Sequence, residues 1–409
     1  MRILIVSHYF PPEIGAPQRR LSDLARMWAA AGNEVTVLTG MPNHPIGIVP
    51  AQYRNKKRVE EVVDGYKVVR TWLYATPNEG VVRKTIGHIS FMLTSLLLGA
   101  RRTGAQDVVI VSSPTFFSIF SAWVLAKLKR SRFVVEVRDL WPAIFVELGI
   151  LTNRMVIRAL ERLEMAAYRA ADAVVVVSEG FKANIAARGI AEGKIHVIPN
   201  GVDLTRFSRR LPNQEIRARL GATEGEAVVL YIGAHGLSHG LESVAECAAR
   251  VQDDPIHFAF VGEGAAKRKL LERVTQLHLT NVTTLPGVPS EEVPDIVAAA
   301  DICLVPLRDV PLFATFIPSK MFEFMAAEKP IIGSVRGEPA EILQAAGAVV
   351  VEPEDPVALA HAIQKLANDP GLRHQIGEAG RQFVADKYDR ERLASRYLDI
   401  VNSVIETRP

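Results

Sequence analysis

Short runs rich in β-branched residues alternate with helical patterns along nearly the whole chain. "RILIVS" precedes the helical pattern "PQRRLSDLARMWAAAG", and the runs "EVTVLT", "YKVVRTW", "DVVIVSS", "FVVEVRD" and "ADAVVVVS" follow it. These runs are apolar without strict alternation, which is typical of parallel strands covered by helices on both faces. The pattern therefore predicts an α/β fold built on doubly wound sheets.

The pattern begins a second time after "IPNGVDLTRF", with "AVVLYIG", "IHFAFVG", "VTTLPG", "DICLVPL", "KPIIGS" and "GAVVVE". A chain of 409 residues also exceeds what one ordinary core accommodates. We expect one Rossmann-like domain over residues 1–205 and a second over 206–385. The last helical pattern, within 386–409, is expected to cross back and pack on the first domain. Because such sheets bind ligands at the carboxyl ends of their strands, the loops there and a cleft between two facing domains are the places to examine.

The composition is that of a globular protein, with 48% hydrophobic residues, 23% charged residues and a net charge of +3. This charge is too small, and its lysines and arginines too dispersed, for a nucleic-acid-binding protein. Cys247 and Cys303 lie in apolar contexts without ligands at metal spacing, so we expect buried thiols in a reducing compartment and no metal site. The apolar run at the N-terminus is a strand, too short for a signal peptide.

In each predicted domain, one glycine-bearing loop follows the first strand. The first, "SHYFPPEIGAPQRR", contains Gly15, and the second, "YIGAHGLSHGLE", contains Gly233, Gly236 and Gly240. Glycine lets backbone N–H groups face an anion, so the two loops could hold one diphosphate between them. The three-glycine dinucleotide fingerprint is missing, which disfavours a nicotinamide-dependent dehydrogenase.

A third loop carries charged groups in "FIPSKMFEFMAAEKPIIGS", residues 316–334. Ser319 and Lys320 stand at the start of a predicted helix, and Glu323 follows one turn later. A carboxylate at this position can accept hydrogen bonds from the two hydroxyls of a ribose, at roughly 1.5–3 kcal/mol each. The alternative for Glu323 is an ordinary capping role at the helix N-terminus.

These stretches, together with "RDLWP", "ADAVVVVSEGFKANI" and "KIHVIPNGVDLTRF", resemble the retaining glycosyltransferases of family 4 over essentially the whole chain. The resemblance implies the GT-B fold and transfer of a sugar from a UDP-sugar without a metal or other cofactor. Within the family the chain is similar to the O-antigen and capsule branch, which moves N-acetylfucosamine or similar sugars to a polyprenyl-diphosphate-linked acceptor. By the same resemblance, Gly15 approaches the donor diphosphate and Glu323 binds the ribose.

The chain departs from the family pattern at positions that contact the donor. Thr315 stands where the family has the first glutamate of its pair, near the donor sugar. Ala234 and His239 stand where an arginine and a lysine usually clamp the diphosphate. Ser319 and Lys320, with Gly233 and His239, are our candidates for that function.

The acceptor base is a choice between two residues. Asp139, in "RDLWP" at a strand end, is the first candidate, and His44, in "MPNHPIG", is the second. The alternatives are a capping role for Asp139 before Trp141 and Pro142, and an ordinary polar loop position for His44.

The most apolar stretch is "TIGHISFMLTSLLLGARR", residues 85–102, which is shorter than the roughly 20 residues of a membrane-spanning helix. Either it is a buried core helix, or it lies on a membrane surface with its basic ends at anionic headgroups. The second interpretation fits a lipid-linked acceptor and places the protein in the cytoplasm, on the inner face of the membrane. The docking residues would be Arg83, Lys84, Leu96, Leu97, Arg101 and Arg102.

Two other function classes stay open at this point. A UDP-sugar epimerase shares the two-domain architecture but needs no acceptor. A non-catalytic sugar-nucleotide-binding subunit of a polysaccharide assembly would bind UDP without transferring sugar, and Thr315 in place of the family glutamate is compatible with it.

Overall fold

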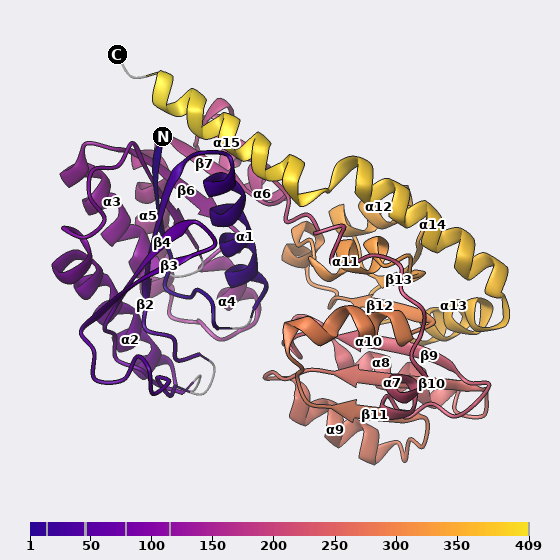
Figure 1. The fold of residues 1–409 in the computed structure, drawn as a ribbon. Helices are drawn as coiled ribbons and strands as arrows, with labels where there is room; N and C mark the ends of the chain where they lie inside the picture. Colours follow the sequence, from indigo (N-terminus) through magenta and orange to yellow (C-terminus); the bar gives the residue numbers. More distant parts are fainter. Residues whose placement is uncertain (14, 45–46, 78–79, 114–115, 408–409) are drawn as a thin grey trace. The chain divides into compact units, whose positions relative to one another are not determined.

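A computed structural model describes residues 1–13, 15–44, 47–77, 80–113 and 116–407 (Figure 1). The chain divides into two compact units. Unit 1 comprises Met1–Pro199 with Glu391–Pro409, and unit 2 comprises Asn200–Arg390. The divisions therefore fall a few residues before the predicted boundary at 205 and a few residues after the predicted boundary at 386.

Unit 1 is built on a sheet with the strand order β3-β4-β2-β1-β5-β6-β7-β8. Its pairs are parallel except for β3 with β4, which form an antiparallel edge. The central strands β1, β5, β6 and β7 are almost wholly buried, as their largely apolar sequences predicted. The strands are β1 (Arg2–Val6), β2 (Glu34–Gly40), β3 (Arg58–Val63), β4 (Tyr66–Thr71), β5 (Val108–Ser112), β6 (Arg132–Val137), β7 (Ala173–Val176) and β8 (Ile195–Val197).

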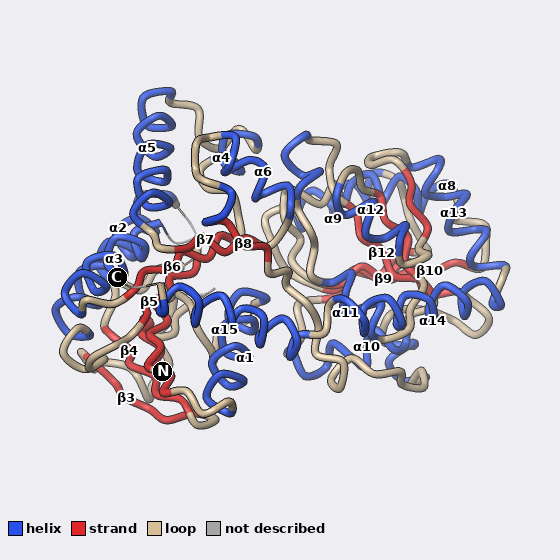
Figure 2. Tube along the Cα trace, turned by 90° about the horizontal axis from the view of Figure 1, so that it is seen from above, coloured by secondary structure: helices blue, strands red, loops and turns tan. Residues whose placement is uncertain are grey.

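Helices cover both faces of this sheet, with α1 and α15 on one side and α2, α3 and α5 on the other (Figure 2). Trp28 of α1 packs edge-on against Tyr397 of α15, and its indole donates a hydrogen bond of 2.9 Å to the Ala394 carbonyl. The prediction that the last helix packs on the first domain is therefore confirmed. The helices are α1 (Ala16–Ala30), α2 (Val81–Thr94), α3 (Phe116–Lys129), α4 (Ala143–Glu147), α5 (Arg154–Ala170), α6 (Glu179–Ala187) and α15 (Arg390–Glu406).

A buried ion pair joins α1 to β6 inside unit 1. Arg20 Nε lies 2.9 Å from Glu136 Oε1, and the Glu136 side chain is wholly removed from solvent. The same guanidinium donates to the carbonyls of Ile198 and Pro199, the last residues of unit 1 before the chain enters unit 2. Burial alone would raise the pKa of Glu136, but Arg20, Arg138 and the Ser112 hydroxyl outweigh it and hold the pKa below its usual value.

Unit 2 contains a six-stranded parallel sheet with the order β11-β10-β9-β12-β13-β14. Its core joins β9, β10 and β12 to α8 and α13, and includes the buried free thiol of Cys247. The strands are β9 (Ala227–Ile232), β10 (Ile256–Val261), β11 (Val282–Leu285), β12 (Ile302–Pro306), β13 (Ile331–Ser334) and β14 (Val349–Val351). The helices are α7 (Gln214–Arg219), α8 (Leu241–Arg250), α9 (Lys267–Gln276), α10 (Val293–Ala299), α11 (Lys320–Ala326), α12 (Glu338–Ala345), α13 (Pro356–Asn368) and α14 (Pro370–Lys387).

The apolar stretch over 85–102 is neither wholly buried nor wholly exposed. It lies in α2 and in a π-helical turn at Ser95–Gly99. Phe91 is completely buried, whereas Leu97 is 80% exposed and Leu96 is only partly buried. Among the helices that the structure describes, none has the length and apolarity needed to cross a membrane.

Candidate functional site

The glycine-rich loop of unit 2 leaves the carboxyl end of β9, the central strand of that sheet. Gly233 has φ +130°, a conformation that favours glycine over other residues. The Tyr231 hydroxyl donates to the Ala234 carbonyl at 2.6 Å, and the His235 N–H donates to the Glu263 carbonyl at 2.8 Å. These two bonds hold the loop in one conformation at the sheet edge where α/β folds bind their ligands.

Lys320 directs its ammonium group at this loop from the start of α11. Its Nζ lies 3.8 Å from the centre of the Tyr231 ring and would lie 3.2 Å from a Cβ added at Gly233. The Nζ is removed from solvent and has no hydrogen-bond acceptor among the described residues. Burial lowers the pKa of Lys320 to about 7, with a partial offset from Glu323. An ammonium in this state is stabilised by any anion that reaches it.

Two other cations at the same edge of the sheet already have partners. Lys267 Nζ lies 2.7 Å from Glu263 Oε1 and also donates to the Gly262 carbonyl. Arg308 Nε lies 3.5 Å from Glu354 Oε1. Lys320 differs from both in having its charge uncompensated by an ion pair, which makes it the natural contact for an anionic ligand.

Three other residues predicted around the donor belong to the same stretch of chain as Lys320. Glu323 is half-buried on α11, and its charge lies close enough to Lys320 to raise the pKa of the Lys320 ammonium. Ser319 precedes α11 without capping it through its side chain. Thr315 ends a 3₁₀ turn at Pro311–Thr315 and donates to the Leu312 carbonyl at 2.8 Å.

His239 does not supply the charge that its position in the pattern led us to expect. Its Nδ1 lies 3.2 Å from the Pro306 carbonyl at the end of β12. Burial, with a further contribution from Lys320, lowers the pKa of His239 to about 3. The ring is therefore neutral at ordinary pH and can offer a ligand only a neutral hydrogen-bonding group.

Two residues of this site were missed by the sequence reasoning. Tyr231 stands in the quoted loop "YIGAHGLSHGLE" but was assigned no role; its ring supports the Lys320 ammonium and its hydroxyl holds the loop. His235 is fully buried against the Tyr231 ring, with ring centres 5.6 Å apart. The signal available for Tyr231 was its position at the carboxyl end of a central strand, just before Gly233 of the glycine-rich loop.

In unit 1 the predicted residues also lie at carboxyl ends of strands. Gly15 precedes α1, and a Cβ at this position would stand 2.3 Å from the oxygen at the end of the Gln18 side chain, which would have to move to admit it. Asp139 follows β6, where burial raises the pKa of its carboxyl group and Arg138 partly offsets the effect. His44 lies in the loop after β2, and its backbone N–H donates to Glu13 at 2.9 Å.

The predicted docking residues are unequally placed. Arg83, Arg101 and Arg102 are exposed, whereas Lys84 is partly buried. The predicted residue Leu97 is exposed after α2, and further exposed apolar side chains lie on α2 and α3; they are Val82, Ile86, Leu93, Phe120 and Leu128.

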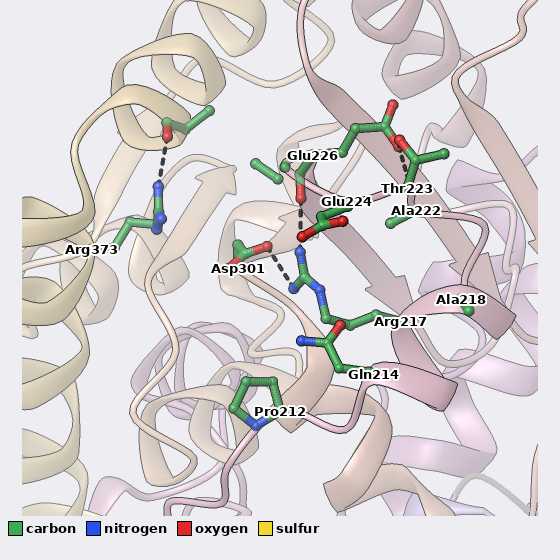
Figure 3. A pocket seen from close by; sticks show the side chains of 13 residues that line it. Pro212, Gln214, Arg217, Ala218, Ala222, Thr223, Glu224, Glu226, Asp301 and Arg373 are labelled. Atoms are coloured by element: carbon green, nitrogen blue, oxygen red, sulfur yellow. Dashed lines mark hydrogen bonds and ion pairs between the residues drawn. The ribbon is translucent and has the colours of Figure 1, made fainter.

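A cavity of about 820 Å³ lies elsewhere in unit 2, at the amino ends of β9 and β12 (Figure 3). The guanidinium of Arg217, which lines the cavity, donates hydrogen bonds to the Asp301 carboxylate at 2.8 Å and to the Glu226 carbonyl at 2.7 Å. Arg373 donates to the carbonyls of Leu366 and Ala367 at the end of α13. Because these cations are used internally, and because α/β folds bind ligands at the opposite strand ends, the cavity is structural. Within the described residues, no group of three His, Cys, Asp or Glu side chains is arranged to hold a metal ion.

Comparison with known proteins agrees with this geometry. Residues 15–201 match the family described as "Glycosyl transferase 4-like domain", and residues 212–383 match "Glycosyl transferases group 1". The chain thus belongs to the two-domain glycosyltransferases that these families define, and the predicted GT-B fold is confirmed.

Three individual proteins are similar to it over nearly their whole lengths. WcaI of Escherichia coli (strain K12), assigned to colanic acid biosynthesis as a glycosyl transferase, is 25% identical over 409 residues, covering 98% of this chain and 99% of WcaI. Sucrose-phosphate synthase from Thermosynechococcus elongatus superposes with a TM-score of 0.79 at 21% identity, covering 100% of both chains. HepE from Anabaena, solved in complex with UDP-glucose, superposes with a TM-score of 0.73 at 16% identity, covering 98% of this chain and 100% of HepE.

Proposed function

We propose that this glycosyltransferase transfers a sugar from a UDP-sugar to a lipid-linked glycan acceptor, with retention of configuration, in the synthesis of a surface polysaccharide. The observation that carries the proposal is the buried, unpaired ammonium of Lys320 beside Gly233 at the carboxyl end of β9. The similarity to WcaI supports a polysaccharide product. The UDP-glucose bound in HepE supports a nucleotide-sugar donor.

Donor binding is assigned to the loop after β9 and to α11. The diphosphate accepts a hydrogen bond from Lys320 Nζ and from N–H groups of the glycine-rich loop, and Glu323 accepts hydrogen bonds from the ribose hydroxyls. Thr315, which replaces the glutamate of the family pattern, faces the sugar, for which we propose an N-acetylated deoxyhexosamine of the N-acetylfucosamine type. Gly15 of unit 1 is proposed to approach the same diphosphate.

The reaction breaks the bond between the anomeric carbon and the β-phosphate oxygen, and the acceptor oxygen attacks from the face that the phosphate leaves. The negative charge that develops on the leaving diphosphate is stabilised by Lys320, which contributes most where water is excluded. Asp139 is our first candidate for the base that takes the acceptor proton, because burial raises the pKa of its carboxyl group towards the range useful for proton transfer. His44 is the second, because burial lowers the pKa of its ring and keeps it neutral and able to accept a proton.

The acceptor proposal rests on α2 and α3. Their sequences contain no acidic residue, and Arg83, Arg101, Arg102 and Lys127 are exposed on or beside them. Exposed apolar side chains bordered by cations are typical of surfaces that bind anionic membranes. We therefore propose that unit 1 binds the inner face of the cytoplasmic membrane, where a polyprenyl-diphosphate-linked acceptor would be found.

Calorimetric titration of the wild type with UDP, GDP and several UDP-sugars tests the donor assignment. Micromolar binding of UDP, about −8 kcal/mol, with no binding of GDP supports it. Failure of a folded protein to bind any nucleotide would refute it. Conversion of a UDP-sugar to another sugar nucleotide without an acceptor would identify an epimerase instead.

A further inference from the structure

A second group of polar side chains lies in unit 1, at the carboxyl ends of β1 and β2, and the proposed donor chemistry makes no use of it. His8 and Tyr9 follow β1, His44 follows β2, and Lys84 and His88 lie one turn apart on α2. The ring centres of His8 lie 4.5 Å from those of Tyr9 and of His88, and the Tyr9 and His44 rings lie 5.1 Å apart. The Tyr9 hydroxyl and His88 Nε2 are 3.3 Å apart.

The carboxylate nearest to this group is already saturated. Glu13 Oε1 accepts the backbone N–H groups of Asn43 and His44 at 2.8 and 2.9 Å, and its Oε2 accepts the N–H of Phe10 at 3.2 Å. These three bonds fix the loops after β1 and β2 against each other. They also leave the Glu13 carboxylate with little capacity to attract a cation or to accept bonds from a ligand.

The groups that stay available include one ammonium, that of Lys84. Lys84 forms no ion pair within the described part of the chain, and its charge lies near enough to His44 and His88 to lower the pKa of both rings. The Tyr9 hydroxyl lies within hydrogen-bond distance of His88 Nε2, and the direction of that bond depends on the tautomer of the ring; in either tautomer the neutral ring has one N–H donor. His8 is 5% exposed, and its Nδ1 has no hydrogen-bond partner among the described residues. Each neutral ring has one N–H donor and one acceptor nitrogen, so the group that favours an anion here is the Lys84 ammonium among these donors.

We propose that this cluster binds a phosphate group of the acceptor lipid, with Lys84 and His88 as its principal contacts. The inference rests on the proposed function, because a lipid-linked acceptor supplies both the phosphate and an apolar chain. The placement supports this source, since α2 carries Lys84 and His88 on the side facing the cluster and Ile86, Leu93 and Leu97 exposed on another. A lipid chain in the membrane beneath the exposed side of α2 would bring its phosphate to the first turns of the same helix. Lys84 thus serves the acceptor phosphate rather than the membrane surface.

Titration with geranyl diphosphate, a short soluble prenyl diphosphate, tests the proposal. The full chain carrying Lys320→Met is used, so that the proposed donor site does not compete for the probe. Binding is followed by calorimetry and by the NMR signals of the histidine rings. We expect geranyl diphosphate to shift the signals of His44 and His88.

Two variants and one control locate the binding. Lys84→Met and His88→Phe, which keeps a ring against His8, should each weaken binding by at least tenfold. Lys56→Met removes an exposed cation of unit 1 outside the proposed membrane surface and should change the affinity less than twofold. Absence of binding, or equal weakening by Lys56→Met, would overturn the proposal, and the melting temperature of Lys84→Met is measured to establish that this variant is folded.

Inorganic pyrophosphate separates the two sources of the anion. Binding at least tenfold weaker than that of geranyl diphosphate supports a lipid phosphate, whereas equal binding overturns the lipid assignment. The nucleotide titration of the wild type is independent of both results. Loss of UDP binding with retention of geranyl diphosphate binding would refute the donor site alone, and the reverse result would refute the acceptor phosphate site alone.

Discussion

Lys320→Met should make the unliganded protein more stable while it weakens nucleotide binding. The wild-type ammonium is buried without an acceptor, and its pKa of about 7 lies below the ordinary value of 10.5. That difference corresponds to roughly 4–5 kcal/mol of unfavourable burial at pH 7. Contact with the Tyr231 ring, at 3.8 Å, offsets about 1–2 kcal/mol. Methionine has a similar length and no charge, so the variant should gain about 3 kcal/mol, or about 6–12 °C in the melting temperature of a unit of this size.

The pH dependence of this gain has a definite sign. Between pH 7 and 10.5 the unfolded chain binds more protons at residue 320 than the folded chain, so wild-type stability rises with pH over this window. The advantage of Lys320→Met should therefore be largest at pH 6 and fall to about 1 kcal/mol or less at pH 10. Scanning calorimetry at pH 6, 8 and 10 measures it.

Lys329→Met is the matched control, since Lys329 is also largely buried in unit 2 but its Nζ donates to the carbonyls of Ala298 and Ala300 at 2.6 and 2.8 Å. Loss of these bonds should lower the melting temperature and leave UDP binding within twofold. Lys320→Met should weaken UDP binding about 10- to 150-fold, the equivalent of one charge-assisted hydrogen bond. A melting temperature unchanged or lowered at pH 6, together with unchanged UDP affinity, would refute the role assigned to Lys320.

Three further outcomes follow from the structure. UDP affinity should fall as pH rises above 7, by up to about tenfold per unit, because binding needs the Lys320 ammonium; titration at pH 6.5 and 8.5 checks this, and Lys320→Met should abolish the dependence. Glu136→Gln should destabilise unit 1 by about 3 kcal/mol in urea unfolding, since it leaves a buried guanidinium without its counter-charge; a change under 1 kcal/mol would contradict the assigned pairing. Leu93→Glu with Leu97→Glu should abolish sedimentation with anionic liposomes without unfolding the protein, whereas Leu211→Glu, at an exposed leucine of unit 2, should not; equal sedimentation of all three proteins would exclude docking through α2.

The order of strands and helices was readable from the sequence because both sheets are parallel and covered on each side. Strands such as β1 and β9 are then continuous apolar runs, and the helices between them show a single apolar face. The unit boundaries were less readable, because residues near 199 and 390 lie in continuous chain without a change of composition. The Arg20 bonds to the carbonyls of Ile198 and Pro199, which fix the end of unit 1, depend on contacts that no local pattern encodes.

The sequence was sufficient to place Gly233 in a loop after a strand, and Lys320 and Glu323 in the first turn of a helix, because motifs mark these positions. What could not be predicted is the state of each group, because burial and hydrogen bonding depend on distant segments. His239 was expected to help with charge, but the Pro306 carbonyl and its burial keep it neutral. Lys84 was assigned to the membrane surface from its sequence position alone, and its proximity to His44, which belongs to another segment, could not be read from the sequence.

The central claim, that α11 binds the ribose and diphosphate of a uridine nucleotide, is tested most directly by a thermodynamic cycle. UDP and 2′-deoxy-UDP are titrated into the wild type and into Glu323→Ala. If Glu323 accepts a bond from the 2′-hydroxyl, the wild type should prefer UDP by about 10-fold or more, at roughly 1.5–3 kcal/mol, and the variant should bind both nucleotides alike. The same preference for UDP in both proteins would contradict the account, because the ribose would then be recognised elsewhere.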